Sequence, residues 1–240
     1  MTITDFHSHI LPGIDDGSRC VEESIAMLRM EAEQGITQVI ATPHFYPSHH
    51  RPEDFLAKRR EAEERLQEAR SGQDGLPRVL VGAEVYFFPG MSESDYLQRL
   101  TIDSKGCILL EMPVCPWTES MYREIENIRV RQGLTPVIAH IDRYIRPLRT
   151  HGIPERLEQL PVLVQANASF FLQCSTRGMA LRMLRKGQIH LLGSDCHDLV
   201  RRLPNLGAAT ALIRKHLGDA VLERICSCQQ YVLEEKELSV

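Results

Sequence analysis

Short apolar segments alternate along this chain with longer segments of helical spacing, and this alternation limits the folds that are open to it. Seven segments have the length and apolar content of buried β-strands, namely residues 2–6, 37–42, 78–82, 107–110, 136–139, 162–165 and 188–193. Helices are expected around them, over residues 21–34, 52–70, 121–131, 179–185, 208–216 and 219–227. Strands that are separated by helices argue for parallel pairing. The pattern therefore predicts an α/β fold, either a barrel or a large open sheet.

The length of the chain favours the barrel, formed by a single domain. One α/β barrel commonly takes about 200–250 residues, and this chain has 240. No interior segment is rich in Pro, Gly and Ser, as an interdomain linker would be. Hydrophobic residues make up 43% and charged residues 25%, values that are typical of a globular protein and argue against disorder. We therefore expect one domain over residues 1–240.

The charge balance is slightly acidic, with 28 Lys and Arg against 32 Asp and Glu and a formal net charge of −4. Proteins that bind nucleic acid usually carry a basic excess, because neutralising phosphates supplies most of their affinity. Nucleic acid is therefore not an expected partner. A local basic patch is compatible with the sequence, and its candidate residues are Arg146, Arg149, Arg201 and Arg202.

Neither a membrane nor an oxidising compartment is indicated. Residues 1–7 contain no charged leader before an apolar stretch, and no apolar run approaches the roughly 20 residues that span a bilayer. The 7 cysteines are scattered without CxxC spacing, so we expect neither disulfides nor a thiolate zinc site. The expected location is the cytoplasm. Cys196 alone lies inside a motif, and we interpret it as a small buried side chain.

The most informative residues are polar side chains that follow the predicted strands. In chain order they are His7 and His9, His44, Glu84, Glu111, His140, Asn167, and Asp195 with His197. Any one histidine could merely cap a strand through a hydrogen bond. A carboxylate beyond an apolar strand is costly unless it is paired or metal-bound. Because functional groups of parallel barrels gather at the carboxyl ends of the strands, we expect all these side chains at one rim.

Imidazole and carboxylate ligands without thiolate suit manganese, iron or zinc. The set exceeds the three or four protein ligands of one zinc ion, so two or three divalent ions are implied. Ions some 3.5–4 Å apart can clamp the oxygens of a phosphoryl or acyl centre and activate a bound water. Asp15 and Asp16 add a carboxylate pair, although one of them could serve only a turn and a helix cap near Ser18.

In this order the motifs resemble the PHP (polymerase and histidinol phosphatase) superfamily. They are most similar to its bacterial protein-tyrosine-phosphatase branch, the CpsB/YwqE type of the capsule and exopolysaccharide systems. The resemblance rests on HSHILPGIDDGS at 7–18, ATPHF at 41–45, AHIDRY at 139–144 and GSDCH at 193–197, and it extends over roughly residues 5–202. One departure is Asp142, where many relatives have Glu.

The resemblance implies a distorted, TIM-barrel-like (β/α)7 barrel with a trinuclear metal site, most commonly loaded with manganese. By motif matching, the first ion would be held by His7, His9, Glu84 and Asp195. The second would be bridged by Glu84 and held by Glu111 and His140. The third would be held by Asp16, His44 and His197.

The activity implied is that of a metal-dependent phosphomonoesterase that acts on phosphotyrosine in proteins. A metal-activated hydroxide would attack phosphorus, and Arg143 and Arg202 could grip the phosphate. Arg202 could equally be a basic surface residue beside Arg201. No Cys-x5-Arg phosphate loop is present, which argues against a cysteinyl-phosphate route. The natural substrate implied by the family is a bacterial tyrosine kinase that governs polysaccharide export.

Other functions compete with this interpretation. A phosphatase for a small metabolite such as histidinol phosphate would use the same ligands, and loops 45–52 and 87–94 could shape either a closed pocket or an open mouth. A metal-dependent nuclease is disfavoured by the net charge of −4. An amidohydrolase fits the two Glu positions poorly. A non-catalytic metal-binding module is the remaining alternative, and the sequence carries no signal for an oligomeric state.

Overall fold

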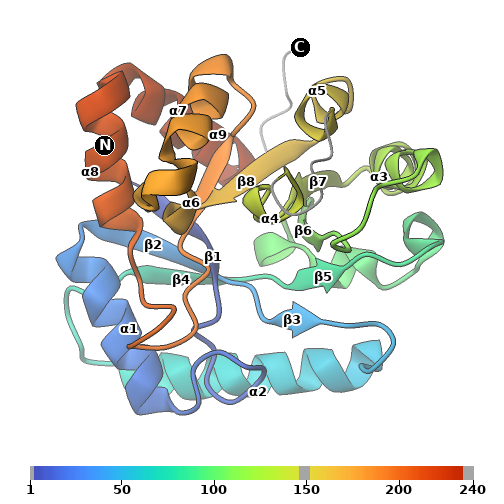
Figure 1. The fold of residues 1–240 in the computed structure, drawn as a ribbon. Helices are drawn as coiled ribbons and strands as arrows, with labels where there is room; N and C mark the ends of the chain where they lie inside the picture. The colour runs from blue at the N-terminus through green and yellow to red at the C-terminus, as the bar shows by residue number, and fades with distance from the viewer. Residues whose placement is uncertain (1–2, 146–151, 235–240) are drawn as a thin grey trace.

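The computed structural model describes residues 3–145 and 152–234, and Figure 1 shows their strands gathered into one curved sheet with helices around it. All strand pairs are parallel. The strands are β1 (Ile3–Ser8), β2 (Ile36–Ala41), β3 (His44–Phe45), β4 (Arg78–Val81), β5 (Glu84–Tyr86), β6 (Cys107–Glu111), β7 (Thr135–Ile138), β8 (Leu163–Asn167) and β9 (Leu191–Gly193). Each of the seven predicted strands is present.

Two of the predicted strands continue, after a short break, as a second strand. Thr42 and Pro43 separate β2 from β3, and Gly82 and Ala83 separate β4 from β5. Proline has no N–H to donate to a strand ladder, which explains the first break. At the second break, the Cα of Ile102 lies 3.3 Å from where a Cβ on Gly82 would stand. The two breaks lie side by side and divide the sheet into β1-β2-β4 and β3-β5-β6-β7-β8-β9.

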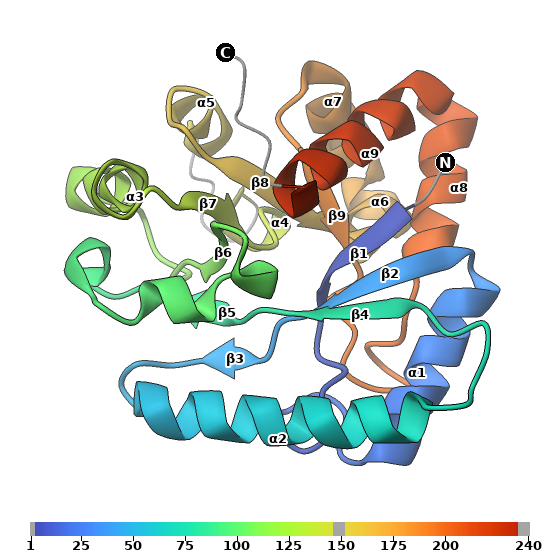
Figure 2. The ribbon, with the colours of Figure 1, turned by 180° about the vertical axis from the view of Figure 1, so that it is seen from behind.

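The ends of the sheet meet beyond β9, and this contact closes the barrel (Figure 2). The backbone N–H of Asp195 donates to the carbonyl of His7 at 2.7 Å, and that of His9 donates to Cys196 at 2.9 Å. A parallel bridge joins Ser8 to Cys196. The expected distorted (β/α)7 barrel is therefore confirmed.

The predicted helices are also confirmed. They are α1 (Val21–Glu33), α2 (Pro52–Arg70), α3 (Glu119–Gln132), α7 (Cys174–Lys186), α8 (Leu206–Leu217) and α9 (Asp219–Glu234). Three helices of only four or five residues were not predicted, because so short a segment carries no helical period. These are α4 (Asp142–Ile145), α5 (Ile153–Leu157) and α6 (Ala168–Leu172). Within the described ranges, no helix is both long enough and apolar enough to cross a bilayer.

Two apolar layers hold the barrel together, because successive side chains of a strand point to opposite faces. The interior layer includes Phe6, Ile40, Leu80, Leu109, Val137 and Leu191. The layer between strands and helices includes Leu28, Val39, Leu110, Ile138 and Leu184. All of these side chains are almost completely buried. The sheet is thus rigid up to the ends of its strands, where the polar side chains begin.

One polar cluster interrupts the outer layer, between α1 and β1. The Oδ1 of Asp5 accepts the backbone N–H groups of His7 at 3.1 Å and Ser194 at 2.9 Å, and so ties β1 to the end of β9. Glu31 faces Asp5 from α1 with no exposed surface. Burial raises the pKa of Glu31 well above its ordinary value, and the nearby charge of Asp5 adds to this effect. A protonated Glu31 can therefore donate to Asp5.

We predict that Glu31→Gln removes a pH-dependent loss of stability. Folding raises the pKa of Glu31 above its ordinary 4.5, so the folded state keeps a proton that the unfolded state releases, and wild-type stability falls as the pH rises above that value. In thermal denaturation, the melting temperature of Glu31→Gln should exceed that of the wild type by more at about pH 8 than at about pH 5.5. Glu33→Gln, on the exposed face of α1, is the matched control and should show no such difference. An equal difference in melting temperature at both pH values would contradict the prediction.

Candidate metal centre

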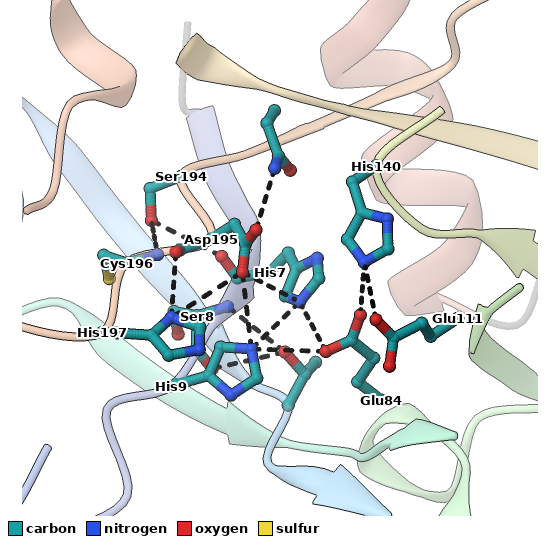
Figure 3. A network of polar contacts seen from close by, with 12 residues as sticks. His7, Ser8, His9, Glu84, Glu111, His140, Ser194, Asp195, Cys196 and His197 are labelled. Carbon is teal, nitrogen blue, oxygen red and sulfur yellow. Dashed lines mark hydrogen bonds and ion pairs between the residues drawn. The ribbon is translucent and has the colours of Figure 1, made fainter. Parts of the chain in front are cut away.

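The nine side chains predicted as metal ligands converge at the carboxyl ends of the strands, and Figure 3 shows seven of them. They are His7, His9, Asp16, His44, Glu84, Glu111, His140, Asp195 and His197. Eight of them are buried or nearly so. Asp16 differs, because its side chain is 66% exposed.

The four side chains predicted for the first ion lie together. The Nε2 atoms of His7 and His9 are 3.1 Å apart. Each of these atoms lies 3.6 Å from Oδ1 of Asp195. The Oε2 of Glu84 is 3.2 Å from His7 Nε2 and 3.4 Å from His9 Nε2. Ring nitrogens and carboxylate oxygens thus face one common point.

The side chains predicted for the second ion adjoin this group through Glu84. Nε2 of His140 lies 2.7 Å from Oε1 of Glu84 and 3.7 Å from Oε1 of Glu111. His44 also reaches this group, with its Nδ1 2.9 Å from Oε2 of Glu84. The sequence did not predict this contact of His44. Glu84 occupies the centre, in keeping with the bridging role expected for it.

The third predicted set forms the outer part of the cluster. Oδ1 of Asp16 lies 3.3 Å from Nε2 of His44 and 3.4 Å from Nε2 of His197. The ring of His9 packs on both histidines, with centroid distances of 4.4 Å to His44 and 3.8 Å to His197. His9 therefore stands between the first and third sets.

Four buried nitrogen and oxygen atoms of the cluster lie close to other members of the cluster, as His44 Nδ1 and Glu84 Oε2 do at 2.9 Å, but form no hydrogen bond of good geometry with any described residue. They are Nδ1 of His44, Oε2 of Glu84, Oε2 of Glu111 and Nε2 of His197. Leaving such an atom unsatisfied costs about 1–3 kcal/mol. Divalent cations bind such nitrogen and oxygen atoms, and this donor set suits manganese, iron or zinc. The residues present therefore fit a group of divalent ions.

The protonation states of Glu84 and His140 favour cation binding. Burial acts to raise the pKa of Glu84, but the charge of His7 and the hydrogen bond from His140 outweigh it and hold that pKa well below its ordinary value. Burial is the main reason that the pKa of His140 falls to about 4. An ionised carboxylate and a neutral imidazole are the forms that coordinate metal ions.

Asp15 is a residue of the site for which the sequence predicted no role as a metal ligand, unlike its neighbour Asp16. Its Oδ2 pairs with Nδ1 of His9 at 2.8 Å and accepts the backbone N–H of His44 at 3.0 Å. Burial opposes the effect, yet the charge of Asp15 raises the pKa of His9 to about 9. Of the alternative that one of the two serves only a turn and a helix cap near Ser18, the cap is wrong, because α1 begins after Cys20 without a side-chain cap. The turn is present, because Oδ1 of Asp15 accepts the backbone N–H of Gly17 at 3.0 Å. Only the structure reveals which carboxylate turns toward which histidine.

Two amides on β8 brace the opposite side of the cluster. Oε1 of Gln165 accepts the backbone N–H of His140 at 2.6 Å, and its Nε2 donates to Asn167 at 3.0 Å. Asn167 in turn donates to Oδ2 of Asp195 at 2.9 Å. The sequence indicated Asn167 as a candidate because it follows a predicted strand, whereas nothing in the sequence indicated Gln165. Together they fix His140 relative to Asp195.

Both predicted arginines lie at the rim of the cluster with partly exposed guanidinium groups. Arg143 bridges Oε1 of Glu111 at 3.1 Å and Oδ2 of Asp195 at 2.7 Å. Arg202 contacts Oδ1 of Asp195 at 2.6 Å, so it is not merely a surface residue. The other basic-patch candidates, Arg146 and Arg149, lie outside the described residues.

Comparison with known proteins places this geometry in a family. Residues 3–233 match the family model for capsular polysaccharide synthesis proteins CpsB/CapC. The tyrosine-protein phosphatase YwqE of Bacillus subtilis is 30% identical over 228 residues, covering 89% of this chain and 85% of that protein. The tyrosine-protein phosphatase CpsB of Streptococcus pneumoniae is 27% identical over 229 residues, covering 89% and 90%.

A solved structure agrees with the sequence comparison. It is one of the crystal structures of YwqE from Bacillus subtilis and CpsB from Streptococcus pneumoniae, which are metal-dependent tyrosine phosphatases. It superimposes with a TM-score of 0.86 at 25% identity, covering 98% of this chain and 96% of the other. The chain therefore belongs to the CpsB/CapC family of capsular polysaccharide synthesis proteins.

Proposed function

We propose that this protein is a metal-dependent phosphomonoesterase that hydrolyses phosphotyrosine in protein substrates. The observation that carries the proposal is the convergence of imidazoles and carboxylates on Glu84, where several buried nitrogen and oxygen atoms lie close together without well-formed hydrogen bonds. The similarity to YwqE and CpsB, which are metal-dependent tyrosine phosphatases, supports it independently.

Two or three divalent ions would be held by the three sets of side chains described above. The first set is His7, His9, Glu84 and Asp195, the second is Glu84, Glu111 and His140, and the third is Asp16, His44 and His197. We expect manganese, and the donor set is equally compatible with iron or zinc. When bound, such ions polarise phosphoryl oxygens and lower the pKa of a coordinated water.

The arginines would orient the phosphate over this centre. A guanidinium group is planar and can bind two phosphate oxygens at once. Arg143 and Arg202 approach Asp195 from its two oxygens, at 2.7 and 2.6 Å, and both remain partly open to solvent. The leaving phenolate has a pKa near 10, so a strong general acid is not required.

The physiological substrate would be a bacterial tyrosine kinase that controls capsule or exopolysaccharide production. The family of capsular polysaccharide synthesis proteins supports this choice. The net charge of −4 argues against a nucleic-acid substrate. The cysteines are scattered without CxxC spacing, so the cytoplasm stays the proposed location.

The first prediction concerns metal dependence. Protein stripped of metal should not hydrolyse a phosphotyrosine peptide, and turnover should return when manganese or zinc is added. The Asp195→Ala variant should keep its circular dichroism spectrum but lose bound metal and activity. Full activity without metal would contradict the proposal. Turnover of histidinol phosphate but not of the peptide would identify a metabolite phosphatase instead.

The second prediction concerns Asp15. Because its carboxylate orients His9 through Nδ1 at 2.8 Å, Asp15→Asn should weaken manganese binding by about 10–100-fold. Competition with a chelator measures this affinity. Asp74→Asn, at an exposed turn, serves as the matched control. An affinity equal to that of the wild type would remove Asp15 from the support of the site.

The third prediction concerns Arg143. Loss of charge-assisted hydrogen bonds should raise the inhibition constant of inorganic phosphate in Arg143→Ala by about tenfold or more. Arg143→Lys should recover only part of this loss, because an ammonium group lacks the planar fork. Arg123→Ala, on the exposed face of α3, is the control. An unchanged response to phosphate in Arg143→Ala would exclude this residue from phosphate binding.

A further inference from the structure

A cavity of about 510 Å³ opens directly beside the outer part of the cluster. Asp16 and His197 form part of its wall, so it is continuous with the candidate metal centre. Asp198, Val200, Arg201 and Arg202, from the turn over residues 198–202, also line it. A ligand group held at the centre would therefore have neighbouring groups close to this turn.

The 198–202 turn is held in one conformation by its own hydrogen bonds. Oδ1 of Asp198 accepts the backbone N–H groups of Val200 and Arg201, both at 2.6 Å. The N–H of His197 donates to the carbonyl of Arg202 at 2.7 Å, which anchors the turn to the cluster. A turn fixed in this way loses little entropy when a ligand binds to it.

Three consecutive side chains of the turn differ in their contacts and exposure. Arg202 reaches inward to Asp195 at 2.6 Å. Arg201 is exposed and lines the cavity. Val200 is 80% exposed at the edge of the cavity, the highest value among the exposed large hydrophobic residues of the described chain. The turn thus presents one cationic and one apolar contact beside the centre.

The acidic groups that line the cavity are already engaged. Glu23 pairs with Arg19 at 3.0 Å, and Asp198 accepts the N–H groups of its own turn. Asp16 faces the imidazoles of His44 and His197. The guanidinium group of Arg201 makes no hydrogen bond or ion pair with any residue that the structure describes. Arg201 is therefore a cation of this cavity that is available to a ligand.

We propose that the 198–202 turn is a peptide subsite, in which Arg201 selects an acidic residue next to the phosphotyrosine and Val200 packs against an apolar one. This inference rests on the proposed function and extends it, because it names the kind of phosphotyrosine sequence that the enzyme prefers. A small phosphate ester that fills only the metal centre would meet Arg202 of this turn but not Val200 or Arg201. The subsite therefore affects protein substrates alone.

The test reverses the charge at Arg201 and, separately, the charge of the residue next to the phosphotyrosine. It is made with the full-length, metal-loaded protein. The substrates are a phosphotyrosine peptide flanked by Glu, the same peptide flanked by Lys, and p-nitrophenyl phosphate. An exposed ion pair changes kcat/KM by about fivefold, so the wild type should prefer the Glu peptide by about that factor. The Arg201→Glu variant should reverse the preference, mainly through KM. Its turnover of p-nitrophenyl phosphate should equal that of the wild type, which also shows that it is folded.

Val200 is tested in the same assay. Val200→Ser should lower kcat/KM for a peptide with an apolar flanking residue and leave p-nitrophenyl phosphate unaffected. Val130→Ser is the matched control, since Val130 is 73% exposed on α3. Arg123→Glu is the corresponding charge control.

The outcomes separate this inference from the proposed function. Equal use of both charged peptides by the wild type, or no reversal in Arg201→Glu, would overturn the subsite and leave the phosphatase intact. Absence of turnover on every substrate with every metal would overturn both. An equal loss on the peptide and on p-nitrophenyl phosphate in Arg201→Glu would mean that Arg201 acts on the centre itself, and would also overturn the subsite.

Discussion

The carboxylate of Glu84 is the charge around which the polar end of the barrel is organised. It is buried, and ring nitrogens lie 2.7–3.4 Å from its oxygens on four histidines, namely His7, His9, His44 and His140. An ionised carboxylate at that depth is strongly destabilising without partners. The imidazoles supply positive charge or N–H donors, yet four buried nitrogen and oxygen atoms of the cluster, His44 Nδ1 and Glu84 Oε2 among them, form no hydrogen bond of good geometry. Divalent cations are the ligands that would satisfy this remaining demand.

The two strand breaks of the barrel lie next to this cluster. Because Pro43 and Gly82 end the ladders of β2 and β4, the chain begins new strands with His44 and Glu84, and these two residues pair in register. The breaks leave the register unchanged, because Ala41 pairs with Val81 before them and His44 pairs with Glu84 after them. Two positions with unusual backbone conformations, His140 with φ 31° and Asp195 with φ 56°, complete the picture. Strained backbone of this kind is commonly found at functional sites.

The interior of the site and its rim differ in burial and in how firmly their side chains are held. Inside, buried side chains are fixed by contacts from Asp15, Gln165 and Asn167, so the donor atoms are preorganised. At the rim, Arg143 and the turn that carries Arg202 remain partly exposed and can meet a substrate. This division allows the same centre to serve different phosphate esters, while residues such as Val200 and Arg201 decide which substrate is preferred.

Much of the fold could be predicted because its signals are local. The apolar runs, the spacing of α1 and α2, and polar residues such as His7 and Asp195 directly after strands are all visible along the chain. The parallel barrel then implies that these polar residues meet at one rim. Short helices such as α4 carried no period and could not be predicted.

The sequence by itself thus determined which residue types would gather at the rim and which chemistry they suit. Only the tertiary structure decided which atoms face each other. Asp15 and Asp16 are adjacent, yet one orients His9 and the other faces His197. Glu31 is an ordinary helical residue in the sequence, but the fold buries it against Asp5. Such partners are distant along the chain, and their distances depend on how the helices and strands pack, which no local spacing records.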